Sequence, residues 1–229
     1  MRLYIVRHGE SHTNVSGRIM SSTDLGLTER GVLQAEAAQK YLRDIKFDHV
    51  FSSPLLRARQ TAEIICGDKD RIEICDELKE MLFGDMEGLT WDERRNRYPD
   101  VNHESGLSQA KVDGGESFDD LVTRCSRFIE SKLEPRGDGE NILITSHGIT
   151  LRVLINCLLK RPSEHVNYIN WADNTAIAEI DVTTRSIVRL NDRKHLTDAE
   201  LGHVAYEQWG LFSEKDYIKL QKITTEEEF

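Results

Sequence analysis

Three features are missing from this sequence of 229 residues: a long apolar segment, a secretory leader and an internal repeat. A membrane-spanning helix needs about 20 consecutive apolar residues, and no run is long enough. The chain starts directly with a strand-like segment, residues 2–6, without the basic and apolar regions of a signal peptide. We therefore expect no membrane partner and no secretion.

Cysteine is scarce, and positive charge is in deficit. The cysteines form no Cys-x-x-Cys pair, so we expect reduced thiols and a cytoplasmic location; they are Cys66, Cys75, Cys125 and Cys157. The formal net charge of −10 repels the backbone of nucleic acids and anionic lipids, which excludes both as default partners. Any site for an anionic substrate must then depend on local arginines.

The alternation of apolar runs and amphipathic segments predicts the fold. The length suits a single domain over residues 1–229. Six runs are expected to be strands: residues 3–6, 50–52, 71–74, 142–145, 176–180 and 187–190. Helices are expected between them. We therefore predict a three-layer α/β/α sandwich with a mostly parallel central sheet and a small lid region.

Two of the expected helices can be described in more detail. Thr28 is expected to cap a helix that runs to about residue 43, with an apolar side formed by Val32, Leu33, Ala37 and Leu42. Pro54 is expected at the start of the next helix, where proline is tolerated, and residues 55–66 follow it. A further amphipathic helix is expected after Ser117, and the helix expected after Gly148, residues 149–159, is apolar on most sides and should be deeply buried.

Two histidines and two arginines follow three of the predicted strands. Arg7 and His8 come directly after the first strand, Arg57 follows the second, and His147 follows the strand at 142–145. Open α/β sheets bind ligands at the carboxyl ends of their strands, so we expect these side chains in one crevice. Guanidinium groups match phosphate oxygens, and an unprotonated imidazole can act as a nucleophile.

The segments around these residues resemble signature blocks of the histidine phosphatase superfamily, also called the phosphoglycerate mutase-like superfamily. The similar blocks are LYIVRHGES at 3–11, SSPLLRARQTA at 52–62, LKEMLFGDMEG at 78–88 and TSHG at 145–148. DNTA at 173–176 resembles a later block, and residues 82–90 look like those of broad-specificity and α-ribazole phosphatases.

The resemblance implies a role for each matching residue. His8 would be the phosphohistidine nucleophile, and Arg7, Arg57 and His147 would bind the phosphoryl oxygens and stabilise the transition state. Glu80 would protonate the leaving group and then activate water.

Other assignments stay open for the carboxylates and for Asn14. Glu77, Asp85 and Glu87 lie near Glu80, and most carboxylates in loops are only solvated. Asn14 would contact phosphate or substrate, or would cap a turn.

A metal site is the alternative for the first block. His8, Glu10 and His12 would share a face of a strand, but Gly9 indicates that the strand has ended. We therefore expect neither a metal nor another cofactor.

Three functions are compatible with these blocks. A phosphomonoester hydrolase acting on a small phosphorylated metabolite is favoured, because GGES at 114–117 resembles the phosphatase branch and no long basic insertion follows Glu80. A cofactor-dependent phosphoglycerate mutase and a non-catalytic phosphate-binding regulatory protein are the alternatives. Residues 89–115 are expected to form a lid that selects the substrate. The C-terminal extension, 191–229, is expected to pack on the domain or to mediate a homodimer.

Overall fold

The computed structural model describes residues 1–99, 101, 111–161, 166, 169 and 173–196. Its centre is a six-stranded sheet in the order β3-β2-β4-β1-β5-β6. The strands are β1 Arg2–Arg7, β2 His49–Ser52, β3 Ile72–Ile74, β4 Asn141–Ser146, β5 Ile177–Asp181 and β6 Ser186–Asp192. Strands β1 to β4 are parallel, whereas β5 and β6 are antiparallel additions at one edge. The predicted strands and the mostly parallel sheet are confirmed.

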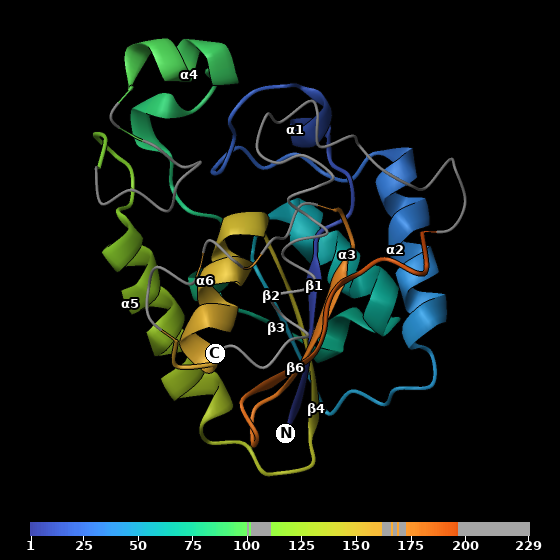
Figure 1. Cartoon of the computed structure of the whole chain (residues 1–229). Coiled ribbons are helices and arrows are strands. Elements are labelled where there is room, and N and C mark those ends of the chain that lie inside the picture. The colour runs from blue at the N-terminus through green and yellow to red at the C-terminus, as the bar shows by residue number, and fades with distance from the viewer. Residues whose placement is uncertain (100, 102–110, 162–165, 167–168, 170–172, 197–229) are drawn as a thin grey trace.

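Helices cover both faces of this sheet. They are α1 His12–Val15, α2 Glu29–Leu42, α3 Leu56–Cys66, α4 Trp91–Arg97, α5 Phe118–Phe128 and α6 Gly148–Leu158. Helices α2 and α3 lie against one face, and α5 and α6 lie against the other (Figure 1). None of the helices in the described part is long and apolar enough to span a membrane.

Alternate residues of β1 build the two halves of the core. Leu3 and Ile5 join the cluster under α5 and α6, whereas Tyr4 and Val6 join the cluster under α2 and α3. Because both faces are covered, the strand reads as a continuous apolar run. This explains why the first strand was evident from the sequence.

The predicted apolar side of α2 is partly wrong. Thr28 caps the helix as expected, since Gly31 N donates to Thr28 Oγ1 at 3.0 Å. Leu33, however, is 50% exposed. A Cβ atom at Gly31 would lie 1.9 Å from Glu10 O, so the helix packs through a glycine directly on the chain that follows β1. That contact sets the rotation of α2, and the residues it buries are Gly31, Gln34, Ala35, Ala38 and Leu42.

The position expected for Pro54 also needs correction. Helix α3 begins at Leu56 with Leu55 as its N-cap, so Pro54 lies before the helix and not in its first turn. The Oγ of Ser53 accepts a hydrogen bond from Leu55 N at 3.3 Å, which bends the chain between β2 and α3.

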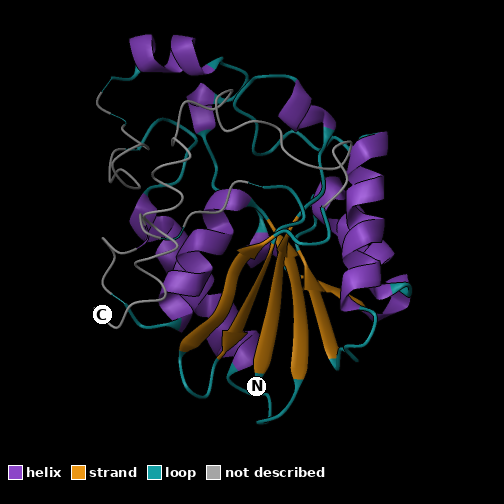
Figure 2. Cartoon of the chain, turned by 45° about the vertical axis from the view of Figure 1, so that its right-hand side comes forward, coloured by secondary structure: helices purple, strands orange, loops and turns teal. Residues whose placement is uncertain are grey.

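The carboxyl ends of the parallel strands meet at one end of the sheet. Arg7 of β1 pairs with Ser146 of β4, and Ser52 of β2 pairs with Thr145. Loops, α1 and α4 lie beyond this end of the sheet, in the upper part of Figures 1 and 2.

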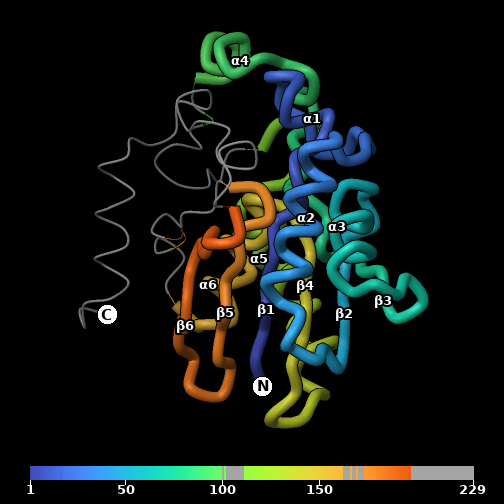
Figure 3. Tube along the Cα trace, turned by 90° about the vertical axis from the view of Figure 1, so that its right-hand side faces the viewer, coloured from blue at the N-terminus to red at the C-terminus, as the bar shows by residue number. Residues whose placement is uncertain are grey.

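Parts of two predicted segments fall outside the description. The lid segment 89–115 is described over α4 and at 111–115, but residues 100 and 102–110 lie outside the described residues. Of the C-terminal extension 191–229, residues 197–229 lie outside. Figure 3 shows β6 and β5 at one edge of the sheet, on the left of β1.

Candidate functional site

His8 lies at the end of β1, inside the molecule. Its side chain is 4% exposed, and its backbone N donates to Ser146 O of β4 at 3.0 Å. His8 Nδ1 lies 2.7 Å from Gly9 O. A carbonyl oxygen can only accept, so Nδ1 carries the proton and Nε2 has the free lone pair. This is the tautomer that a nucleophilic imidazole needs.

The turn after His8 is held from two helices. Gly9 N donates to Thr61 Oγ1 of α3 at 3.0 Å. A Cβ at Gly9 would lie 2.5 Å from Gly31 O of α2, so only glycine fits between the turn and that helix. The local backbone at His8 thus depends on contacts with both α2 and α3.

His147 follows β4 and is the N-cap of α6. Its ring centroid lies 5.1 Å from that of His8. Nε2 lies 2.8 Å from Ser53 Oγ, at the end of β2. Nδ1 is buried and has no hydrogen-bond partner within the described residues. The three strand ends predicted to converge therefore do so around two histidine rings.

Both imidazoles are in an environment that favours the neutral form. Burial lowers the pKa of His8 well below its ordinary value, and the charges of Arg57 and Arg7 lower it further. Burial, Arg57 and His8 lower the pKa of His147 in the same direction. At neutral pH the site therefore combines uncharged imidazoles with positive guanidinium groups.

Arg57 lies in the first turn of α3 and is only 2% exposed. Its Nη1 donates to Thr23 O at 3.0 Å and its Nη2 donates to Ser21 O at 3.1 Å. Burial lowers its pKa, while the nearby Glu80 acts in the opposite direction. No carboxylate of the described residues forms an ion pair with Arg57, so its charge is available to an anionic ligand.

Glu87 is a residue whose role the sequence did not reveal. Its carboxylate accepts hydrogen bonds from the backbone N of Ser21, Ser22 and Thr23, at 2.8 to 3.1 Å, and from the Ser21 and Thr23 hydroxyls. The carbonyls of Ser21 and Thr23 are the acceptors for Arg57. Glu87 therefore holds the loop 21–23 that orients this guanidinium. Burial would raise its pKa, but these hydrogen bonds outweigh that effect and lower it.

Glu80 lies at the N-terminus of α6, the helix whose N-cap is His147. Its Oε1 accepts from Thr150 N at 3.1 Å and from Met81 N at 2.9 Å, and Oε2 lies 3.3 Å from the donor Ile149 N. Two of the three competing carboxylates lie elsewhere: Glu87 binds the loop 21–23, and Asp85 is exposed.

Asn14 and the 173–176 segment contact each other next to the backbone of His8. Asn14 Oδ1 accepts from Ser11 N at 3.0 Å and from Asn174 Nδ2 at 3.2 Å. Asn174 Nδ2 also donates to His8 O at 2.9 Å, and Thr175 N donates to Arg7 O at 3.0 Å. Asn174 is not among the expected site residues, although it lies in the block at 173–176 that resembles a family block.

The side chains of Glu10 and His12 lie in different surroundings and are not arranged as two ligands of one metal. The Glu10 carboxylate accepts from Thr28 Oγ1 at 2.8 Å and from Arg30 at 3.1 Å, which ties α2 to the end of β1. His12 is exposed on α1. Within the described residues, no group of three His, Cys, Asp or Glu side chains is arranged to hold a metal ion.

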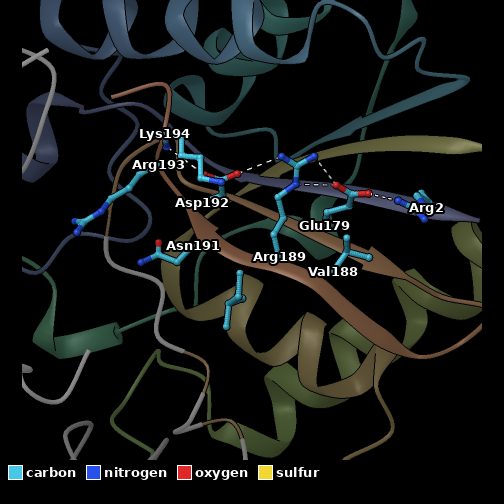
Figure 4. Close-up of a pocket in the computed structure, with 9 residues that line it drawn as sticks. Arg2, Glu179, Val188, Arg189, Asn191, Asp192, Arg193 and Lys194 are labelled. Atoms are coloured by element: carbon cyan, nitrogen blue, oxygen red, sulfur yellow. Dashed lines mark hydrogen bonds and ion pairs between the residues drawn. The ribbon is translucent and has the colours of Figure 1, made fainter. Parts of the chain in front are cut away.

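A cavity of about 820 Å³ lies away from these residues, over β5 and β6 (Figure 4). Its charged groups bind one another: Glu179 accepts from Arg2 and Arg189, and Asp192 accepts from Arg189 at 3.2 Å. Size alone does not make it the site, because it contains none of the histidines that the strand ends bring together.

Known proteins are similar to this chain in both sequence and fold. Residues 3–193 match the model of the histidine phosphatase superfamily (branch 1). The chain is 39% identical to the adenosylcobalamin/alpha-ribazole phosphatase of Salmonella typhimurium over 173 residues, 71% of this chain and 82% of the relative. It is 33% identical to phosphoglycerate mutase-like protein 4 of Arabidopsis thaliana over 158 residues, 66% of this chain and 68% of the relative. The alpha-ribazole phosphatase structure from Shigella flexneri has a TM-score of 0.75 and 32% identity, covering 84% of this chain and 96% of that chain.

Proposed function

Because the chain belongs to the histidine phosphatase superfamily (branch 1), we propose that its phosphohistidine forms on Nε2 of His8. The chain is a phosphomonoester hydrolase that acts through such an intermediate. The observation that carries the assignment to His8 is the 2.7 Å contact of Nδ1 with Gly9 O, because it leaves Nε2 unprotonated and beside Arg57 and His147.

The proposed reaction has two displacements at phosphorus. Nε2 of His8 attacks the phosphorus, the bond to the ester oxygen breaks, and Glu80 gives that oxygen its proton. Water then attacks the phosphohistidine, Glu80 takes the proton back, and the P–N bond breaks to release phosphate. Each displacement restores what the other consumes, so the enzyme ends neutral at His8 and protonated at Glu80.

Positive charge and neutral donors would stabilise both transition states. Arg7 and Arg57 would bind the phosphoryl oxygens, and fixed charges of this kind need no reorganisation during the reaction. His147 Nδ1, which is buried without a partner in the described part, would face one of these oxygens. Asn14 uses its Oδ1 within the fold, which leaves its amide NH₂ to contact the substrate.

Trapping the intermediate tests the assignment of the nucleophile. Incubation with ³²P-labelled phosphomonoester should label the wild-type chain at an acid-labile, alkali-stable bond. His8→Ala should give no label and no turnover, while a folded His12→Ala control should keep both, because His12 is exposed on α1. Label that survives in His8→Ala would remove His8 from the mechanism.

We propose a small phosphorylated metabolite as the substrate, selected by the lid segment 89–115. A panel of phosphate esters that includes α-ribazole phosphate, phosphoserine and 3-phosphoglycerate, assayed for phosphate release, tests this. The mutase alternative is supported by the mutase-like relative, and it predicts isomerisation of 3-phosphoglycerate after priming with 2,3-bisphosphoglycerate, with little phosphate released.

Three broader proposals accompany this function. Residues 1–229 form one domain, for which the single sheet is the support. A cytoplasmic location is supported by the four cysteines, all of which are free thiols. A homodimer that uses the C-terminal extension 191–229 is testable by light scattering of the intact chain and of a chain truncated after residue 196.

A further inference from the structure

The segment that carries Glu80 has little regular structure of its own. It leaves the short 3₁₀ turn Asp76–Leu78, and Lys79 is extended, with φ −58° and ψ 156°. A backbone of this shape makes few hydrogen bonds within itself, so contacts from elsewhere in the fold must set its position. The placement of the Glu80 carboxylate therefore depends on whatever binds residues 77–82.

One side of this segment is bound by β4 and α6. Ser146 Oγ donates to Leu78 O at 2.6 Å, and Thr150 Oγ1 donates to Lys79 O at 2.6 Å. These are the same two elements that flank His147. They tie the segment to the two elements next to His147, but they bind only the carbonyls of Leu78 and Lys79.

Arg124 of α5 binds the same segment over a longer stretch. Its Nη1 donates to Glu77 O at 2.6 Å and to Lys79 O at 2.8 Å, and its Nη2 lies 3.4 Å from Glu80 O. Nε and Nη2 donate to the two carboxylate oxygens of Glu116, each at 2.8 Å. All five N–H groups of the guanidinium are therefore used, three on this segment and two on Glu116.

Glu116 continues the contact beyond Glu80. Its Oε2 accepts from Leu82 N at 3.0 Å, and its own backbone N donates to Leu82 O at 2.9 Å. The side chains of Arg124 and Glu116 are only 11% and 14% exposed. A bidentate pair that is this well covered differs from a surface ion pair, which contributes little.

We propose that Arg124 and Glu116 are positioning residues that hold Glu80 in place for proton transfer. The pair binds the chain on both sides of Glu80, so its loss should displace the carboxylate without touching the phosphoryl site. This inference rests on the proposed acid role of Glu80. A displacement of about 1 Å can cost a catalytic group about 10²-fold in rate.

The test compares two leaving groups in three variants. Arg124→Met removes all five donors, Arg124→Lys keeps the charge without the planar fork, and Glu116→Gln removes the anion. Arg127→Met is the matched control. Arg127 also lies on α5, and it lines a cavity of about 280 Å³ together with Arg124. In the described structure, however, its side chain donates to none of residues 77–82.

The measured quantity is kcat/KM, which reports formation of the phosphoenzyme, for p-nitrophenyl phosphate and for an alkyl phosphate. Arg124→Met should lower the alkyl phosphate value by about 10–100-fold and the p-nitrophenyl value by less than about threefold, because p-nitrophenolate needs little protonation. Glu116→Gln should lower the alkyl phosphate value selectively too, but by a smaller factor. Arg124→Lys should keep part of the alkyl phosphate activity that Arg124→Met loses. The inhibition constant of inorganic phosphate should stay within about twofold, which shows that the phosphoryl site is intact.

A double variant separates the positioning role of Arg124 from the proposed acid role of Glu80, on which it rests. In a Glu80→Gln background, Arg124→Met should add less than about twofold to the loss, since both act through one carboxylate. If Glu80→Gln is selective for alkyl phosphate but Arg124→Met loses both substrates equally, the positioning role is wrong and the acid role stands. If Glu80→Gln is itself unselective, both are wrong. Should Arg124→Met fail to fold, the same ratio in Arg124→Lys and Glu116→Gln decides.

Discussion

Replacing Glu87 by Gln should loosen Arg57, the arginine that we propose binds phosphate, although Glu87 does not contact it. The carboxylate holds the backbone of Ser21, Ser22 and Thr23, and two carbonyls of that loop orient Arg57. Glutamine keeps the size of the side chain and one acceptor oxygen, but it loses the negative charge. The perturbation is therefore electrostatic and local.

The magnitude follows from the bonds involved. Hydrogen bonds to an ionised group contribute about 1.5–3 kcal/mol and neutral ones about 0.5–1.5 kcal/mol. Weakening three backbone bonds by about 1 kcal/mol each and losing the one from Ser21 Oγ to Oε2, at about 1.5 kcal/mol, should cost about 4–5 kcal/mol in total. For a domain of this size, that corresponds to a fall in Tm of about 10–15 °C. A looser Arg57 should weaken inorganic phosphate binding and kcat/KM by about 10-fold or more.

The assay combines thermal unfolding with the inhibition constant of inorganic phosphate. Asp85→Asn is the matched control, because Asp85 is an exposed carboxylate in the 3₁₀ turn Gly84–Met86, two residues before Glu87. The pKa of Glu87 is lowered from its ordinary 4.5, so its stabilisation is present above that pH and is lost as pH falls below it. The gap between wild type and Glu87→Gln should accordingly narrow under acid conditions. Unchanged phosphate inhibition in Glu87→Gln would refute the link to Arg57.

Other parts of the site give further predictions. The folded pKa of His8 lies below its ordinary 6.5, so the unfolded chain binds the extra proton and stability falls as pH decreases through that window. Denaturant unfolding at pH 5 and 6 should show a slope smaller by up to about 1.4 kcal/mol per pH unit in a folded His8→Asn variant than in wild type. Gly31→Ala would place a Cβ atom 1.9 Å from Glu10 O and should cost about 3 kcal/mol or more, whereas Gly137→Ala, with only a side-chain oxygen at 3.7 Å, should change the unfolding midpoint little. In Arg57→Lys a single ammonium nitrogen replaces Nη1 and Nη2, which bind the two loop carbonyls, and it lacks the planar fork that could bind phosphate at the same time. The value of kcat/KM should therefore fall by about 10²-fold; a loss below threefold would contradict the fork geometry.

The sequence by itself determined the sheet and the residues at its carboxyl end. Strands β1 and β4 are buried on both faces, so their apolar runs are continuous and mark the strand ends at which His8 and His147 follow. Because parallel strands end at the same edge, knowing the strands was enough to expect Arg7, Arg57 and the two histidines together. Local spacing carries this information, since each side chain follows its own strand within a few residues.

Only the tertiary structure decided which residues hold that group in place. Glu87 lies 64 to 66 positions from the loop it binds, and Arg124 lies 44 to 47 positions from the carbonyls around Glu80. In the sequence, both are ordinary charged residues among many. The face that α2 buries was also out of reach, because it depends on how closely Gly31 approaches Glu10. Hydrogen bonds between distant segments depend on how helices and loops dock, and no period or spacing along the chain encodes a docking distance.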